Sequence, residues 1–149
     1  MTLTRAHLEA VLIRRCGKLL ALAGLDGATQ DGTNADLTDP LATALRAVGV
    51  PLAVPTEVAD TDVAALPLDA LDEAQDRAEL RALESALGNL ELVDVQYTNH
   101  RESLSDLGKR LEVLILRKST RIEKIYSSSA GGGTLSGGSI GLSFAEEAL

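Results

Sequence analysis

The residues of this chain best suited to bind a metal ion lie in one polar segment, residues 25–38. It holds four oxygen-bearing side chains of the kind that calcium prefers: Asp26, Asp31, Asn34 and Asp36. A calcium loop of the EF-hand type needs a glycine at its sixth position and a glutamate at its twelfth. With Gly32 at the sixth position, the twelfth is Thr38. The spacing therefore does not match a calcium loop, and we predict structural turns at the two Asp-Gly pairs, with no metal site.

Residues that could carry catalysis do not form a recognisable constellation. His7 falls in an expected helix and His100 in a polar connector, so each is interpreted as a surface or capping histidine. Asp72 and Asp76 stand at i,i+4, and without a histidine nearby they are interpreted as solvated charge. The glycine run 131–133 lacks the following helix that a phosphate site needs. We therefore predict no catalytic residues, no cofactor and no enzyme activity.

The single cysteine and the apolar pattern narrow the class of protein further. Cys16 has no partner for a disulfide and stands among leucines, which favours a buried core thiol. No apolar run approaches the 18 residues of a membrane span, and no signal peptide is evident. We expect no membrane association.

Charge is segregated along the chain, whose net charge is −8. Residues 1–25 and 96–125 each carry a surplus of three bases, whereas residues 26–95 hold fifteen acids and three arginines. Each region taken alone is consistent with ordinary solvated helix faces. Regions of opposite sign also suit head-to-tail packing of subunits in a ring. Because the net field repels phosphate, we do not expect the whole chain to bind nucleic acid specifically.

Four principal helices are predicted from apolar periodicity and helix-ending residues. Their approximate ranges are 4–23, 39–48, 68–87 and 103–126, with a single turn near residues 61–62. Gly24, Gly49 and Gly88 are the expected helix stops, and Asp39 and Pro40 the expected start of the second helix. Gly17, inside the first helix, indicates close packing against a neighbour. The fold class is all-α, with a core domain at 1–126.

A C-terminal arm at 127–149 follows this core. The twenty residues 126–145 contain no charged side chain and six glycines, a composition that cannot hold a helix. Ile140, Leu142 and Phe144 alternate with serine or glycine, which is the period of a strand with one apolar face. We predict partner binding through Tyr126, Leu135, Ile140, Leu142 and Phe144. The other interpretation is that Tyr126 caps the last helix and Phe144 is incidental.

A small acidic helical domain with Asp-Gly turns at 26–27 and 31–32, followed by Asp39-Pro40, resembles the head–tail adaptors of tailed bacteriophages and gene transfer agents. So does a last helix that runs through Arg121-Ile-Glu-Lys-Ile-Tyr126 into a Gly-rich terminus. The resemblance implies a structural virion protein at the neck, assembled in the host cytoplasm. It implies a homo-oligomeric ring, usually a dodecamer, that binds the portal protein and neck or tail proteins while DNA passes through without specific binding.

Other interpretations stay open. One is a different neck or tail-completion protein, and another is an unrelated helical interaction module with a disordered tail. The third is an enzyme with a composite site between subunits.

Overall fold

The structure, a computed structural model, describes residues 2–96 and 101–127, with side chains described for 2–90 and 105–127. The principal helices are α1 (Arg5–Leu22), α2 (Thr38–Ala47), α4 (Leu71–Gln96) and α5 (Arg101–Ile122). Short elements complete the order: η1 (Ala35–Leu37), α3 (Asp60–Ala64), η2 (Leu68–Ala70) and the π-turn η4 (Glu123–Ser127). The predicted all-α class with four principal helices is confirmed. The strand predicted at 140–144 lies outside the described residues.

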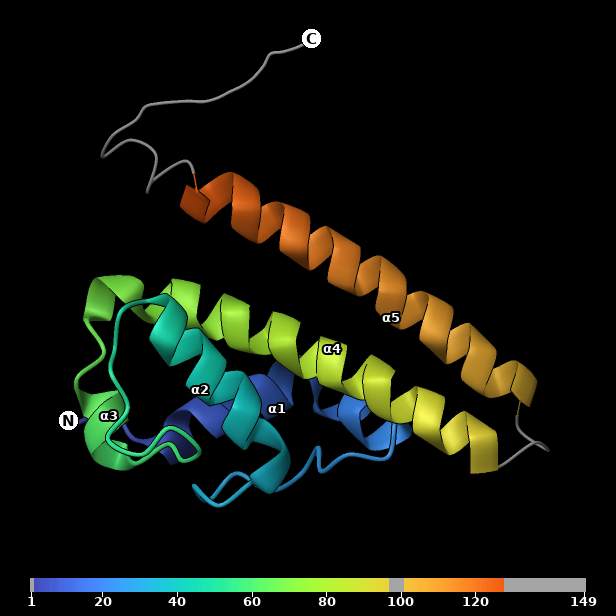
Figure 1. The fold of residues 1–149 in the computed structure, drawn as a ribbon, viewed down its shortest axis with the longest axis horizontal. Helices are drawn as coiled ribbons and strands as arrows, with labels where there is room; N and C mark the ends of the chain where they lie inside the picture. Colours follow the sequence, from blue (N-terminus) through green and yellow to red (C-terminus); the bar gives the residue numbers. More distant parts are fainter. Residues whose placement is uncertain (1, 97–100, 128–149) are drawn as a thin grey trace, which may run out of the picture.

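Helix α4 is the centre of the bundle. It packs against α1 and α2 on one side and against α5 on the other (Figure 1). Its buried stripe contains an alanine at every fourth position, and these are Ala74, Ala78, Ala82 and Ala86. Small side chains at i,i+4 lie on one helix face and let neighbouring backbones approach closely. This face of α4 therefore lets the neighbouring helices pack closely against it.

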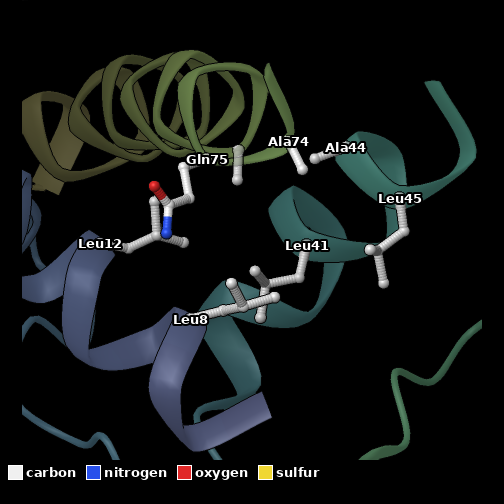
Figure 2. A pocket seen from close by; sticks show the side chains of 8 residues that line it. Leu8, Leu12, Leu41, Ala44, Leu45, Ala74 and Gln75 are labelled. Atoms are coloured by element: carbon white, nitrogen blue, oxygen red, sulfur yellow. The ribbon is translucent and has the colours of Figure 1, made fainter. Parts of the chain in front are cut away.

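The core between α1, α2 and α4 consists mainly of leucine and alanine. Figure 2 shows Leu8 and Leu12 from α1 facing Leu41 and Leu45 from α2, with Ala74 of α4 above them. They surround a space of about 10 Å³. A void of this size without polar partners holds no ordered water. It belongs to the packing of the core and is not a ligand site.

Most helix boundaries follow local chemistry, and two predicted boundaries are corrected. The Thr4 backbone N–H donates to Nδ1 of His7 at 3.0 Å, so His7 caps α1, as one of its two interpretations held. Gly24 and Gly49 have φ of 88° just beyond α1 and α2, as expected of helix stops. The predicted start of α2 at Asp39 is wrong, because the helix begins at Thr38 and continues the 3₁₀ turn η1. Asn34 caps that turn by accepting from two backbone N–H groups with Oδ1.

The predicted end of the third long helix at Gly88 is also wrong. Helix α4 continues through Gly88 to Gln96. A glycine inside a helix costs only about 1 kcal/mol relative to alanine, which tertiary contacts readily exceed. Two such contacts follow Gly88: the side chain of Leu90 is buried, and Asn89 donates from Nδ2 to the Ala23 carbonyl at 2.6 Å.

The polar segment after α1 is held by a buried ion pair. Arg5 donates from Nε to Glu9 Oε2 at 2.8 Å and from Nη2 to the Asn34 carbonyl at 2.6 Å. Glu9 also accepts from the backbone N–H groups of Gly32 and Asn34. Asp26 and Asp31 accept from their own turns, which confirms the structural-turn prediction.

The close packing predicted for Gly17 is confirmed against this segment. A Cβ at Gly17 would lie 2.6 Å from the Gly27 carbonyl oxygen. Only a glycine permits the backbone of α1 to approach the segment so closely.

Candidate functional site

Two carboxylates on one face of α4 form the centre of the candidate site. Asp76 and Glu79 stand at i,i+3, so both project from the same side of the helix, between α1 and α5. Asp76 is only 5% exposed. Ionised carboxylates are buried at this depth when cations and hydrogen-bond donors surround them.

One cation comes from each neighbouring helix. Arg15 of α1 places Nη1 3.1 Å from Asp76 Oδ1 and 3.2 Å from Glu79 Oε1. Lys118 of α5 places Nζ 3.2 Å and 3.0 Å from the same two oxygens. Two acids and two bases compensate one another, so the group links three helices without net charge. We call Asp76, Glu79, Arg15, Lys118 and Tyr126 the Asp76 cluster.

Tyr126, in η4, completes the cluster. Its hydroxyl donates to Asp76 Oδ2 at 2.6 Å, a short distance typical of an O–H group bonded to a carboxylate. Burial, with the hydrogen bond and charge of Asp76, raises the pKa of Tyr126 from 10.0 to about 12.

The carboxylate responds in the opposite direction. Burial alone raises the pKa of Asp76. The hydrogen bond from Tyr126 and the charge of Lys118 outweigh that effect and hold its pKa below the ordinary value of 3.8. Asp76 is therefore ionised, and Tyr126 neutral, at neutral pH.

A cleft with a cationic rim opens beside the cluster, between α1, α4 and α5. It has a volume of about 380 Å³, and its apolar lining includes Cys16, Leu19 and Leu114. Arg110, Arg117 and Arg121 of α5 line it as well.

Cys16 is not a reactive group in this cleft. Its thiol donates to the Leu12 carbonyl at 3.3 Å. Burial raises the pKa of Cys16 to about 12, so little thiolate forms at neutral pH. The structure thus confirms the buried core thiol predicted from the sequence.

Of the five residues predicted to bind a partner, only Tyr126 is within the described part of the chain. It is half-buried, and its hydroxyl is bonded inside the molecule, while a partner role for its ring stays a prediction. Leu135, Ile140, Leu142 and Phe144 lie outside the described residues.

One expectation about the Asp76 cluster was wrong, and one member of the cluster was missed. Asp72 is exposed, as solvated charge should be, but Asp76 is buried and paired. Lys118 was not singled out from the sequence, and its side chain is only 12% exposed. A signal was present in the spacing, because Lys118 stands at i+7 from Leu111 and i−4 from Ile122, both of which are buried.

Other kinds of site find no support in the described ranges. Within residues 2–90 and 105–127, no three His, Cys, Asp or Glu side chains are grouped so as to hold a metal ion. None of the helices that the structure describes is long and apolar enough to cross a membrane. No protein-family model, curated protein or solved structure matches this chain.

Proposed function

We propose that this chain is a structural subunit of a virion neck, a head–tail adaptor of the phage or gene transfer agent type. It forms a homo-oligomeric ring beneath the portal and docks through residues 127–149, while DNA passes through the ring. The proposal rests on the resemblance in architecture and on one observation at the site, the hydrogen bond between Tyr126 and Asp76.

That bond matters because of where it lies in the chain. Tyr126 directly precedes the arm, and Asp76 lies on the central helix of the bundle. The arm therefore begins at a residue that is held in two ways: by the turn η4, which continues α5, and by the hydrogen bond to Asp76 of α4. An adaptor needs such an anchor, because a partner held by a loosely attached arm is not held in register with the ring.

The arm has the length for this role. From Tyr126 to Phe144 a fully extended chain spans roughly 60 Å, at about 3.3 Å per residue. That reach is enough to cross a neighbouring subunit. Ile140, Leu142 and Phe144 would then add a strand to the edge of a partner's sheet, with backbone hydrogen bonds for affinity and apolar side chains for specificity.

Docking to the portal assembly encoded in the same genome tests the proposal. We expect the full chain to co-sediment with that assembly, and a variant lacking residues 128–149 to remain helical by circular dichroism without co-sedimenting. A matched pair of full-length variants separates the roles of two parts of the arm, a spacer at residues 127–138 and the expected strand at residues 140–144. Leu142→Asp should abolish docking, whereas Ser136→Asp, in the spacer, should leave it unchanged.

Three results would contradict the proposal. They are a genome without a portal gene, a full chain that stays in the supernatant, and a truncated variant that docks as well as the full chain. Binding to an isolated tail or neck assembly but not to the portal would instead assign the chain to tail completion.

A further inference from the structure

Helix α5 is attached to the rest of the molecule along one side only. It packs mainly against α4, and it faces α1 across the cleft beside the Asp76 cluster, while α2 and α3 lie on the far side of α4 (Figure 1). Its outer surface exposes two large apolar side chains, Val113 at 48% and Leu116 at 67%. Exposed apolar residues that gather on one helix face, within a basic surround, are typical of protein interaction sites.

Basic residues border these apolar side chains. A shallow groove of about 560 Å³ runs along the end of the helix, and we call it the basic groove; it is lined by Leu116, Arg117, Thr120, Arg121, Lys124 and Ile125. Arg117 and Arg121 also line the cleft beside the Asp76 cluster, so they form the ridge between the two hollows.

These two arginines differ from the two cations of the Asp76 cluster. Arg15 and Lys118 are paired with Asp76 and Glu79. Neither Arg117 nor Arg121 is within 4.0 Å of a carboxylate among the described side chains, and both are exposed. Their charge is therefore available to a partner.

The same chain carries a surface of complementary charge. Residues 25–66, which we call the acidic lobe, contain seven acids and one base, Arg46. Asp31, Asp36 and Glu57 of this lobe are exposed. The segment between α1 and α2, which holds two of these acids, lies on the opposite side of α4 from α5 (Figure 1).

We propose that the basic groove docks the acidic lobe of a second copy of this chain. This inference rests on the proposed ring and names the surfaces that would build it. Because groove and lobe lie on opposite sides of α4, each copy offers one surface to the copy before it and the other to the copy after it. Such a contact is heterologous, and its repetition produces a closed ring or an open filament rather than a two-fold dimer. Charge supplies register and speed of encounter, and Leu116 supplies apolar contact.

Charge reversal tests the proposal without any other virion protein. Sedimentation velocity over a concentration series at low salt should show the wild type associating, and association should weaken as salt rises, because the charges become screened. Arg117→Glu with Arg121→Glu should weaken association by more than about tenfold. Asp31→Lys with Glu57→Lys, on the acidic lobe, should weaken it similarly. As a control of equal charge change, Arg14→Glu with Lys18→Glu should associate far better than the groove variant, since neither residue lines a hollow.

The decisive step mixes the groove variant with the lobe variant. Each alone places like charges together, but the mixture pairs an acidic groove with a basic lobe and a basic groove with an acidic lobe. We expect the mixture to regain assemblies of one-to-one composition. Far-ultraviolet circular dichroism verifies that both variants are folded, and a chain that carries all four substitutions should again self-associate.

Three outcomes would overturn the inference. One is a wild type that is monomeric up to its solubility limit, and another is association that ignores the groove substitutions. The third is binding of double-stranded DNA by the wild type, if the groove substitutions abolish that binding and leave the assembly state unchanged. That result would assign the surface to nucleic acid. Each of these results leaves the portal-docking experiment to be judged separately, so failure of this inference is distinguishable from failure of the proposed function.

Discussion

Replacement of Asp76 by asparagine tests whether the Asp76 cluster ties α5 to the core. The substitution keeps the shape of the side chain and removes its charge. A hydrogen bond to a charged group contributes about 1.5–3 kcal/mol net, and a neutral one about 1 kcal/mol. Asparagine retains one acceptor for Tyr126, and Lys118 and Arg15 retain Glu79 as a partner. We therefore expect Asp76→Asn to lower the free energy of unfolding by about 2 kcal/mol.

Urea unfolding followed by circular dichroism measures this loss, provided that the transition is two-state. Asp72→Asn is the matched control, one helical turn away and exposed, and it should change the free energy of unfolding by less than about 0.5 kcal/mol. A double-mutant cycle with Tyr126→Phe isolates the bond between the two side chains, with an expected coupling energy of about 1 kcal/mol. Equal effects of Asp76→Asn and Asp72→Asn, or strict additivity in the cycle, would refute our account of the cluster.

The same variant has a defined dependence on pH. The pKa of Asp76 is lowered in the folded protein, so its contribution to stability is present above the ordinary pKa of 3.8 and is lost as pH falls through the folded value. The difference in stability between wild type and Asp76→Asn should therefore be constant near neutrality and shrink below about pH 4. A difference that grows on acidification would contradict the direction of the pKa shift.

Four further predictions concern single residues. The pKa of Tyr126 is raised from 10.0 to about 12, so its contribution to stability is complete below pH 10.0 and is lost as pH rises toward 12; urea titrations of wild type should show this loss and those of Tyr126→Phe should not. Gly17→Ala should destabilise the fold by about 1–3 kcal/mol through its contact with the Gly27 carbonyl. A Cβ at Gly88 would have no atom within 4 Å, so Gly88→Ala should stabilise the fold by about 0.5–1 kcal/mol. Thermal melts in which Gly17→Ala and Gly88→Ala have the same effect would contradict both predictions. Cys16 should react with a thiol reagent only when the protein unfolds, and fast labelling under native conditions would disprove its burial.

Much of the fold could be predicted from local patterns. Leu8, Leu12 and Cys16 repeat at helical spacing, and all three are buried on one face of α1. The glycines at 24 and 49 end their helices because the left-handed conformation there has little cost without a Cβ. Gly88 is also a glycine in a sequence context that resembles a helix end, and yet α4 continues through it. The difference lies in contacts made by Asn89 and Leu90, which local sequence does not reveal.

The candidate site was harder to predict for a similar reason. The acids at 76 and 79 and the base at 118 are separated by about forty residues, and Arg15 is more distant still. Each of them alone is indistinguishable from an ordinary surface charge. Only the packing of α1 and α5 against α4 brings each of the two bases within 3.0–3.2 Å of each of the two acids.

The amino-acid sequence by itself determined which segments are helical, where most of them end, and that a stretch without charged side chains, residues 126–145, follows. These properties depend on periodicity and on backbone preference, which act over a few neighbouring residues. Tertiary structure decided which charges are solvated and which are structural, since burial and pairing depend on residues far apart in the chain. It also decided that Tyr126 bonds to Asp76, and that α5 presents two arginines outward while its lysine at 118 faces the core.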